Sequence, residues 1–236
     1  MDIKSKIKVV FVDIDNTLLS FSEFVKETMK SGFEKYGLKP YTEDMFAVFE
    51  KINNSLWRRL ERGELNLKSL EAIRWNLIFE ALDIDFDGVE FERYFKEQLF
   101  VSAIPVPNGK EMLEYLSSKY ILCSASNGPY EQQLNRLCQA GMFDYFKHHF
   151  ISEKVGVDKP AKAFFDYAFE EMRASGMTGL LPEETMIIGD SMSSDMAGGS
   201  GYGMRTCLFA PGGTGDKDVS GLDAVIYNLI EIKDIL

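Results

Sequence analysis

The feature that most constrains the fold is a short apolar run, residues 9–12, which ends in two carboxylates one residue apart, Asp13 and Asp15. The run does not alternate with polar residues, which is typical of a strand buried on both faces of a parallel sheet. Parallel sheets hold their sites at the carboxyl ends of their strands, so the two acids are predicted to lie at such a site. Two carboxylates that converge there would repel each other unless a divalent cation lay between them. The alternative for this segment alone is a strand followed by an ordinary Asp/Asn turn.

Composition limits the kinds of partner. The chain has 236 residues, of which 45% are hydrophobic, and this is enough for a large core. Its net charge of −11 at pH 7 argues against nonspecific binding to nucleic acid or to an anionic membrane, because both need a basic face. A protein of this charge that acts on phosphate has to carry its positive charge locally, as a metal ion and a few Lys or Arg side chains.

The sequence also predicts a location and a redox state. No apolar run approaches the length of a membrane span and no signal-peptide core follows Met1, so a cytoplasmic location is expected. The cysteines are odd in number, form no CxxC pair and lie in apolar segments. We therefore expect three buried, reduced thiols, at Cys123, Cys138 and Cys207.

The spacing of apolar residues changes along the chain and predicts two parts. Residues 20–100 carry apolar residues at helical spacing, divided by turn signals at 37–40 and at Gly63, which indicates a bundle of helices. Strands and helices alternate after that, with strands predicted at 120–125, 149–152, 185–190, 205–209 and 224–227. We therefore predict an α/β protein with a doubly wound, Rossmann-like parallel sheet. Its core comprises residues 1–19 and 101–236, and residues 20–100 form an α-helical cap inserted after the first strand.

Further reactive groups are predicted to meet the first acidic pair at the same edge of the sheet. Asp190 ends another apolar run and Asp195 lies shortly after it, so this loop can add oxygen ligands for magnesium. Ser126, at the end of a further strand, offers a hydroxyl to phosphate oxygens, and Lys159, at a predicted helix start, offers a cation. Taken singly, Ser126 fits a turn, Lys159 a solvated helix start and Asp190 a turn or a ligand. Their combination indicates a phosphate site.

With these residues the sequence resembles the haloacid dehalogenase superfamily of phosphohydrolases. All four motifs of that family occur in order: Asp13-Ile14-Asp15-Asn16-Thr17, then Ser126, then Lys159, then Gly189-Asp190-Ser191-Met192-Ser193-Ser194-Asp195. The match spans almost the whole chain, and the predicted helical part stands where that family has its helical cap.

The resemblance implies a role for each motif residue, and the chemistry of the side chains agrees with it. Asp13 would attack phosphorus and form an aspartyl-phosphate, while Asp15 would protonate the leaving alcohol and then deprotonate the hydrolytic water. Mg2+ would be held by the Asp13 carboxylate, the Asp15 backbone carbonyl and Asp190. Asp195 would bind the metal through water or orient Lys159.

Substrate contacts are predicted in both parts of the chain. In the core, the phosphoryl oxygens would be bound by Ser126, Asn127 and Lys159. Within the superfamily the sequence is most similar to the 5′-nucleotidases that hydrolyse nucleoside monophosphates, often pyrimidine ones. The residues that carry this similarity are Asp195-Met196-Ala197-Gly198-Gly199, Thr206-Cys207, Leu56-Trp57, Gly63-Glu64 and Arg74. Trp57 and Arg74 are therefore candidates to contact the nucleoside, although Trp57, like Trp75, is also suited to packing the bundle.

Alternative functions share much of this pattern. The expected partner is a small phosphomonoester, first a nucleoside monophosphate, but a phosphatase of the same fold could act on phosphoglycolate or a sugar phosphate instead. A dehalogenase is disfavoured because that branch does not need an acid–base residue at position 15. A mutase would need a lid that excludes water. A phospho-accepting regulatory domain could also use a strand-end Asp with magnesium, but Asp15 and the large cap argue against it.

Overall fold

The computed structural model describes residues 6–236, and these form two compact units. The cap unit is the helical insertion, Phe21–Ser102. The core unit comprises the chain up to Ser20 together with Ala103–Leu236. The insertion therefore starts one residue later and ends two residues later than the predicted range of 20–100. Among the described residues, no helix is long and apolar enough to cross a membrane.

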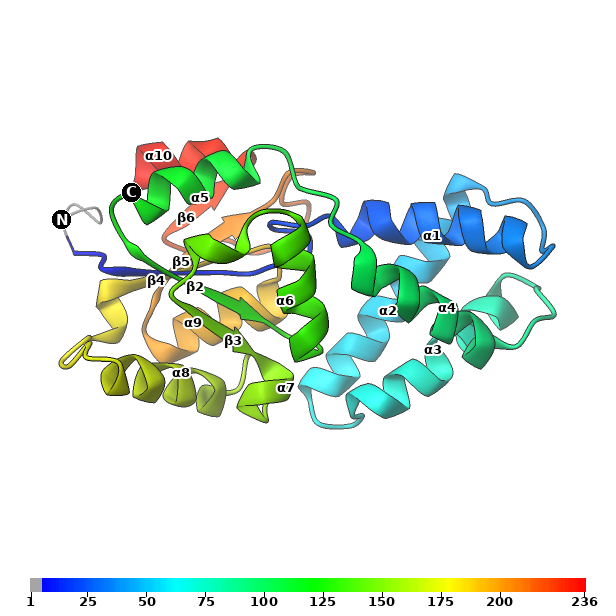
Figure 1. Cartoon of the computed structure of the whole chain (residues 1–236), viewed down its shortest axis with the longest axis horizontal. Helices are drawn as coiled ribbons and strands as arrows, with labels where there is room; N and C mark the ends of the chain where they lie inside the picture. Colours follow the sequence, from blue (N-terminus) through cyan, green and yellow to red (C-terminus); the bar gives the residue numbers. More distant parts are fainter. Residues whose placement is uncertain (1–5) are drawn as a thin grey trace. The chain divides into compact units, whose positions relative to one another are not determined.

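Six parallel strands form the sheet of the core unit, which confirms the predicted Rossmann-like, doubly wound α/β fold (Figure 1). The strands are β1 (Val9–Val12), β2 (Ile121–Ser126), β3 (His148–Ile151), β4 (Thr185–Gly189), β5 (Arg205–Phe209) and β6 (Ala224–Ile226). Their order across the sheet is β3-β2-β1-β4-β5-β6. From β1 the chain continues outward to β2 and β3, and from β4 it continues in the opposite direction to β5 and β6. The boundary between β1 and β4 is therefore a topological switch point, where open α/β sheets form their ligand crevice.

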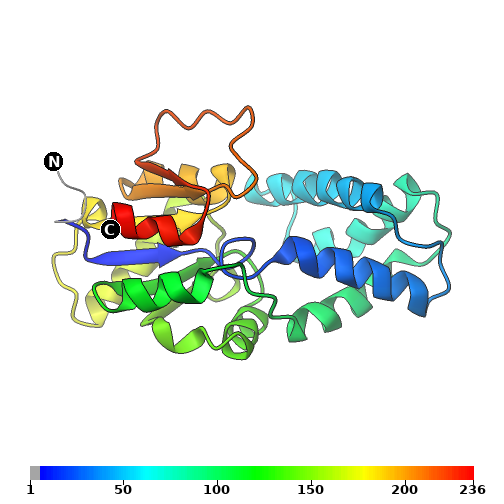
Figure 2. The same ribbon diagram turned by 90° about the horizontal axis from the view of Figure 1, so that it is seen from above.

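Alternate residues of β1 enter two apolar cores, one on each face of the sheet. Val10 and Val12 pack in a cluster with residues of α5 (Gly109–Ser117), α6 (Tyr130–Gln139) and α10 (Ile232–Ile235). Val9 and Phe11 pack in a second cluster with α8 (Lys162–Ala174). Figure 2 looks onto the first of these faces, where α5 and α10 lie side by side. Two short helices, α7 (Ser152–Val155) and α9 (Ala197–Tyr202), complete the set of α-helices described in the core unit.

The cap unit is built around aromatic side chains. Its helices are α1 (Phe21–Lys35), α2 (Glu43–Glu61), α3 (Leu67–Ala81) and α4 (Gly88–Val101). The rings that pack between them are Phe24, Phe33, Phe49, Trp75, Phe79, Phe91 and Phe95. The packing role expected of Trp75 is therefore confirmed, since its side chain is fully buried. Burial of this many rings gives the insertion an apolar core of its own.

Two expectations about the core unit are wrong. Cys138 is exposed, whereas Cys123 and Cys207 are buried as expected. Cys138 lies seven residues after the exposed Glu131 on α6, so it shares the outer face of that helix. The helix expected to open at Lys159 begins only at Lys162, because the backbone amide and carbonyl of Lys159 are bonded to the Asn127 side chain instead.

Candidate active site

Three carboxylates meet where β1 and β4 end. Asp13 follows β1, Asp190 follows β4, and Asp195 lies in the turn Met192–Met196. One oxygen of each lies within 4.8 Å of the others. The register explains the meeting, because Val12 pairs with Ile188 and the Asp13 amide donates to the Ile188 carbonyl at 2.9 Å. The strand ends are therefore level, and the acids that follow them converge.

A glycine admits the third carboxylate to this cluster. A Cβ atom placed on Gly189 would lie 2.2 Å from Asp195 Oδ2, so the Asp195 side chain occupies space that any other residue at 189 would fill. The same oxygen accepts a hydrogen bond from the Ser191 amide at 3.1 Å. The Gly189-Asp190 pair thus supplies one carboxylate and makes room for another.

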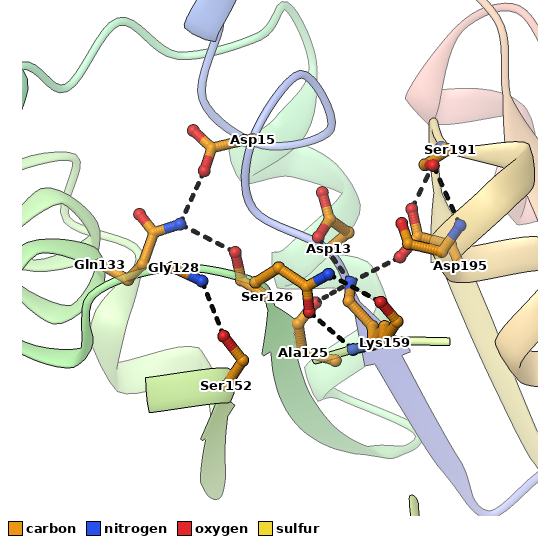
Figure 3. A network of polar contacts seen from close by, with 12 residues as sticks. Asp13, Asp15, Ala125, Ser126, Gly128, Gln133, Ser152, Lys159, Ser191 and Asp195 are labelled. Atoms are coloured by element: carbon orange, nitrogen blue, oxygen red, sulfur yellow. Dashed lines mark hydrogen bonds and ion pairs between the residues drawn. The ribbon is translucent and has the colours of Figure 1, made fainter. Parts of the chain in front are cut away.

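Lys159 is the positive charge of the cluster (Figure 3). Its ammonium donates to Asp13 Oδ1 at 2.8 Å, to Asp195 Oδ1 at 2.5 Å and to the Ala125 carbonyl at 2.6 Å. Burial of the side chain, which is 1% exposed, disfavours its charged form, but the two carboxylates outweigh that effect and raise the pKa of Lys159. The lysine is therefore held as a cation.

Asn127 fixes the backbone that carries this lysine. Its side-chain oxygen accepts from the Lys159 amide at 2.8 Å, and its side-chain nitrogen donates to the Lys159 carbonyl at 2.9 Å. Both polar ends of the side chain are engaged in this way. The contact that the structure gives Asn127 is thus with Lys159, and its predicted contact with substrate stays a prediction.

The carboxylates of the cluster carry more negative charge than Lys159 offsets. Burial is the main cause that raises the pKa of Asp13 well above its usual range, with Asp195 and Asp190 adding repulsion and Lys159 opposing it. Loss of hydration, with repulsion from Asp195 next, raises the pKa of Asp190 to about 7. Oxygen ligands of this density and charge fit a hard divalent cation such as magnesium.

Asp15 lies apart from the three-carboxylate cluster and faces α6. Its Oδ1 accepts from Arg136 Nη1 at 2.6 Å, and its Oδ2 accepts from Gln133 Nε2 at 2.6 Å. The same Gln133 nitrogen donates to Ser126 Oγ at 2.8 Å (Figure 3). Sequence analysis missed Gln133 and Arg136. The sequence feature that could have identified them is their i, i+3 spacing. This spacing places two long polar side chains on the same side of a helix as the core residue Leu137.

A family model agrees with this arrangement. The model described as haloacid dehalogenase-like hydrolase matches residues 7–203, which is most of the chain. The chain belongs to this hydrolase family. The match includes the whole insertion and every predicted motif residue.

Individual proteins are similar to this one over most of the chain. A crystal structure of YfnB from Bacillus subtilis, a HAD hydrolase solved with magnesium bound, has a TM-score of 0.86 at 28% identity and covers 98% of this chain and 99% of that one. PynA, a pyrimidine 5′-nucleotidase of Streptococcus pneumoniae, is 28% identical over 86% of this chain and 84% of its own length. A glyceraldehyde 3-phosphate phosphatase of Pyrococcus furiosus is 24% identical over 98% of this chain and 92% of its own length.

The two predicted cap contacts differ in what surrounds them. Arg74 is buried, and its guanidinium donates to both oxygens of Glu92 and to the Asn53 side chain. Trp57 is partly buried against a small cluster that contains Leu56 and Leu60. The contacts that the structure gives Arg74 are thus with Glu92 and Asn53, and the predicted substrate contacts of Arg74 and Trp57 stay predictions.

Proposed function

We propose that this hydrolase cleaves phosphomonoesters through an aspartyl-phosphate on Asp13. The observation that carries the proposal is the buried Lys159 ammonium, which bonds to Asp13 and Asp195 at the switch point of the sheet. A fixed cation beside a strand-end carboxylate suits a reaction in which a phosphoryl group, rich in negative charge, approaches that carboxylate.

The residues that would hold magnesium are Asp13, Asp190, the Asp15 backbone carbonyl and, directly or through water, Asp195. Both Asp195 oxygens already have donors within the protein, in Lys159 and the Ser191 amide, which favours a role in orienting Lys159. When bound, magnesium would lower the repulsion between an anionic nucleophile and an anionic substrate.

The side chains divide the chemistry between them. An Asp13 oxygen forms the new bond to phosphorus as the bond from phosphorus to the ester oxygen breaks, and Asp15 gives that oxygen a proton. Asp15 then takes a proton from water, whose oxygen attacks phosphorus and releases Asp13 and inorganic phosphate. Ser126 and Lys159 bind the phosphoryl oxygens during both steps. Because atoms and charges balance at each step, no further reactant is required.

We also propose that the substrates are nucleoside 5′-monophosphates, pyrimidine before purine. The similarity to a pyrimidine 5′-nucleotidase over most of both chains supports this choice. A small sugar phosphate is the second candidate, supported by the similarity to a glyceraldehyde 3-phosphate phosphatase over nearly the whole chain. The groups described at the core site suit phosphate and metal alone, so discrimination between these substrates falls to other parts of the protein. Trp57 is proposed to contact the base.

A panel of phosphomonoesters tests the proposal. Hydrolysis with magnesium of UMP, dTMP, AMP, phosphoglycolate, glyceraldehyde 3-phosphate and a hexose phosphate should give the highest kcat/KM with a pyrimidine nucleotide. Trp57→Ala should lower kcat/KM for that nucleotide by about tenfold or more, the ~1–3 kcal/mol that stacking of a base on an aromatic ring contributes. The same variant should leave a small phosphate ester little affected. If a sugar phosphate or phosphoglycolate exceeds every nucleotide, the nucleotidase proposal fails and the phosphatase proposal stands.

A further inference from the structure

Two residues of α6, Gln133 and Arg136, join the Asp15 carboxylate to the Ser126 hydroxyl, and no motif of the sequence assigns either a role. Both are buried, at 1% exposure each. The Asp15 side chain is 30% exposed, so these α6 residues bind a carboxylate that is still accessible to solvent. All four residues belong to the core unit.

The hydrogen bonds of Gln133 have only one consistent direction. Arg136 Nη1 can only donate hydrogen bonds, so its contact with Gln133 Oε1 at 2.8 Å identifies that atom as the amide oxygen. The amide nitrogen must then face the other way, where its two hydrogens meet Asp15 Oδ2 and Ser126 Oγ at 2.6 and 2.8 Å. Every polar atom of the Gln133 side chain is used.

This direction determines what Asp15 and Ser126 can offer a substrate. Each Asp15 oxygen receives one donor, Arg136 for Oδ1 and Gln133 for Oδ2, which fixes the rotation of the carboxylate. Each oxygen keeps a second lone pair, which can carry the proton that is transferred. Ser126 Oγ accepts from Gln133, so its own hydrogen is left to be donated elsewhere, as a phosphoryl oxygen requires.

We propose that Gln133 and Arg136 are positioning residues that align the Asp15 carboxylate for proton transfer to the leaving alcohol and orient the Ser126 hydroxyl toward the phosphoryl group. This inference rests on the phosphatase function proposed for the same site. A purely structural role would make the ion pair between Arg136 and Asp15 a fold contact only, with no effect specific to proton transfer.

Substrates that differ in their leaving group separate these two roles. The value of kcat/KM includes steps only as far as departure of the leaving group, so it reports on proton donation by Asp15 and not on the later hydrolysis. An alkyl phosphate such as UMP needs that proton, whereas p-nitrophenyl phosphate releases a stable anion that does not. Binding of the phosphoryl group by Ser126 is common to both esters.

The experiment compares Gln133→Met with Gln139→Met, an exposed position on the same helix. Gln133→Met should lower kcat/KM for the alkyl phosphate at least about tenfold more than for p-nitrophenyl phosphate, because a misplaced general acid forfeits much of its ~10²–10⁴-fold contribution. Arg136→Lys, which keeps the charge and one donor, should show a smaller split in the same direction. Gln139→Met should leave both values unchanged. Equal losses for the two esters, or a gain for the alkyl ester, would overturn the inference.

A crystal structure of the full-length Gln133→Met variant gives a readout that does not depend on activity. We expect the Asp15 carboxylate to leave the position it holds in the wild type or to occupy several rotamers. An Asp15 side chain in the single wild-type position would overturn the inference, whatever the kinetics. If instead the wild type hydrolyses no phosphomonoester, the proposed function fails, and the position of Asp15 in the variant still decides whether α6 orients it.

Discussion

At the scale of single residues, Lys159 and Gly189 explain how three carboxylates can lie close together. Lys159 supplies a buried positive charge to Asp13 and Asp195, and Gly189 leaves the space that the Asp195 carboxylate fills. Loss of hydration and repulsion from Asp195 raise the pKa of Asp190 to about 7, although the Lys159 cation opposes this rise. A divalent cation would offset the negative charge that Lys159 leaves unbalanced among the three carboxylates.

Metal affinity should separate the roles of Asp190 and Asp15. Asp190→Ala should weaken magnesium binding by removing a carboxylate ligand, whereas Asp15→Asn should retain the affinity because only its backbone carbonyl is expected to bind the metal. In the wild type the affinity should fall as the pH drops through about 7, since a protonated Asp190 is not a ligand. Titration calorimetry measures all three effects. Asp166→Ala serves as the control, because Asp166 is an acid on the surface of α8. Equal losses in the Asp190 and Asp15 variants would contradict this division.

At the scale of elements, the sequence predicted the strands well because most of them contain a compact apolar run followed by a turn signal. The acids after β1 and β4 could be placed at one site because parallel strands end at the same edge. The contribution of α6 could not be placed in this way. Gln133 and Arg136 lie within an ordinary amphipathic helix, and only the packing of α6 beside the site turns their polar ends toward Asp15 and Ser126.

The sheet edge beyond β2 contains a half-buried histidine that should make stability depend on pH. His149 on β3 bonds through Nδ1 to Ser124 Oγ at 2.9 Å and stacks on Phe143. Burial is the main cause that lowers its pKa to about 4 from the ordinary 6.5, with His148 and Lys154 adding repulsion. Between these two values the unfolded chain binds the extra proton, so the free energy of unfolding should decrease as the pH falls from about 6.5 to about 4.

Urea unfolding at several pH values measures this effect. His149→Gln, which keeps a hydrogen-bonding group opposite Ser124, should lose less stability than the wild type over the same range of pH. His148→Gln serves as a matched control, because His148 is the adjacent residue on β3 and its side chain contacts Ser175 instead of Ser124. That control should keep most of the wild-type sensitivity to acid. Identical pH dependence in the wild type and His149→Gln would show that His149 does not contribute.

At the scale of the whole molecule, the sequence predicted a sheet with an inserted helical part, and the structure describes two units that each have an apolar core. The sheet packs on both faces around β1, while rings such as Trp75 and Phe91 fill the insertion. Helical spacing predicted that the insertion is a bundle of helices, yet it did not show that Arg74 turns inward to Glu92. A side chain with three polar nitrogens fits a substrate contact or a buried ion pair equally well in sequence, and only the three-dimensional packing reveals the ion pair.

The central claim, that Asp13 becomes phosphorylated during hydrolysis of a phosphomonoester, can be tested by trapping the enzyme in turnover. Acid quenching during hydrolysis of the best substrate with magnesium, followed by peptide mass spectrometry, should find a phosphoryl group on the peptide that contains Asp13. The modification should be absent without magnesium, and Asp13→Asn should remain unmodified with turnover reduced by several powers of ten, as expected for loss of a nucleophile. Steady hydrolysis with the phosphoryl group on another residue, or undiminished hydrolysis by Asp13→Asn after deamidation is excluded, would contradict the account.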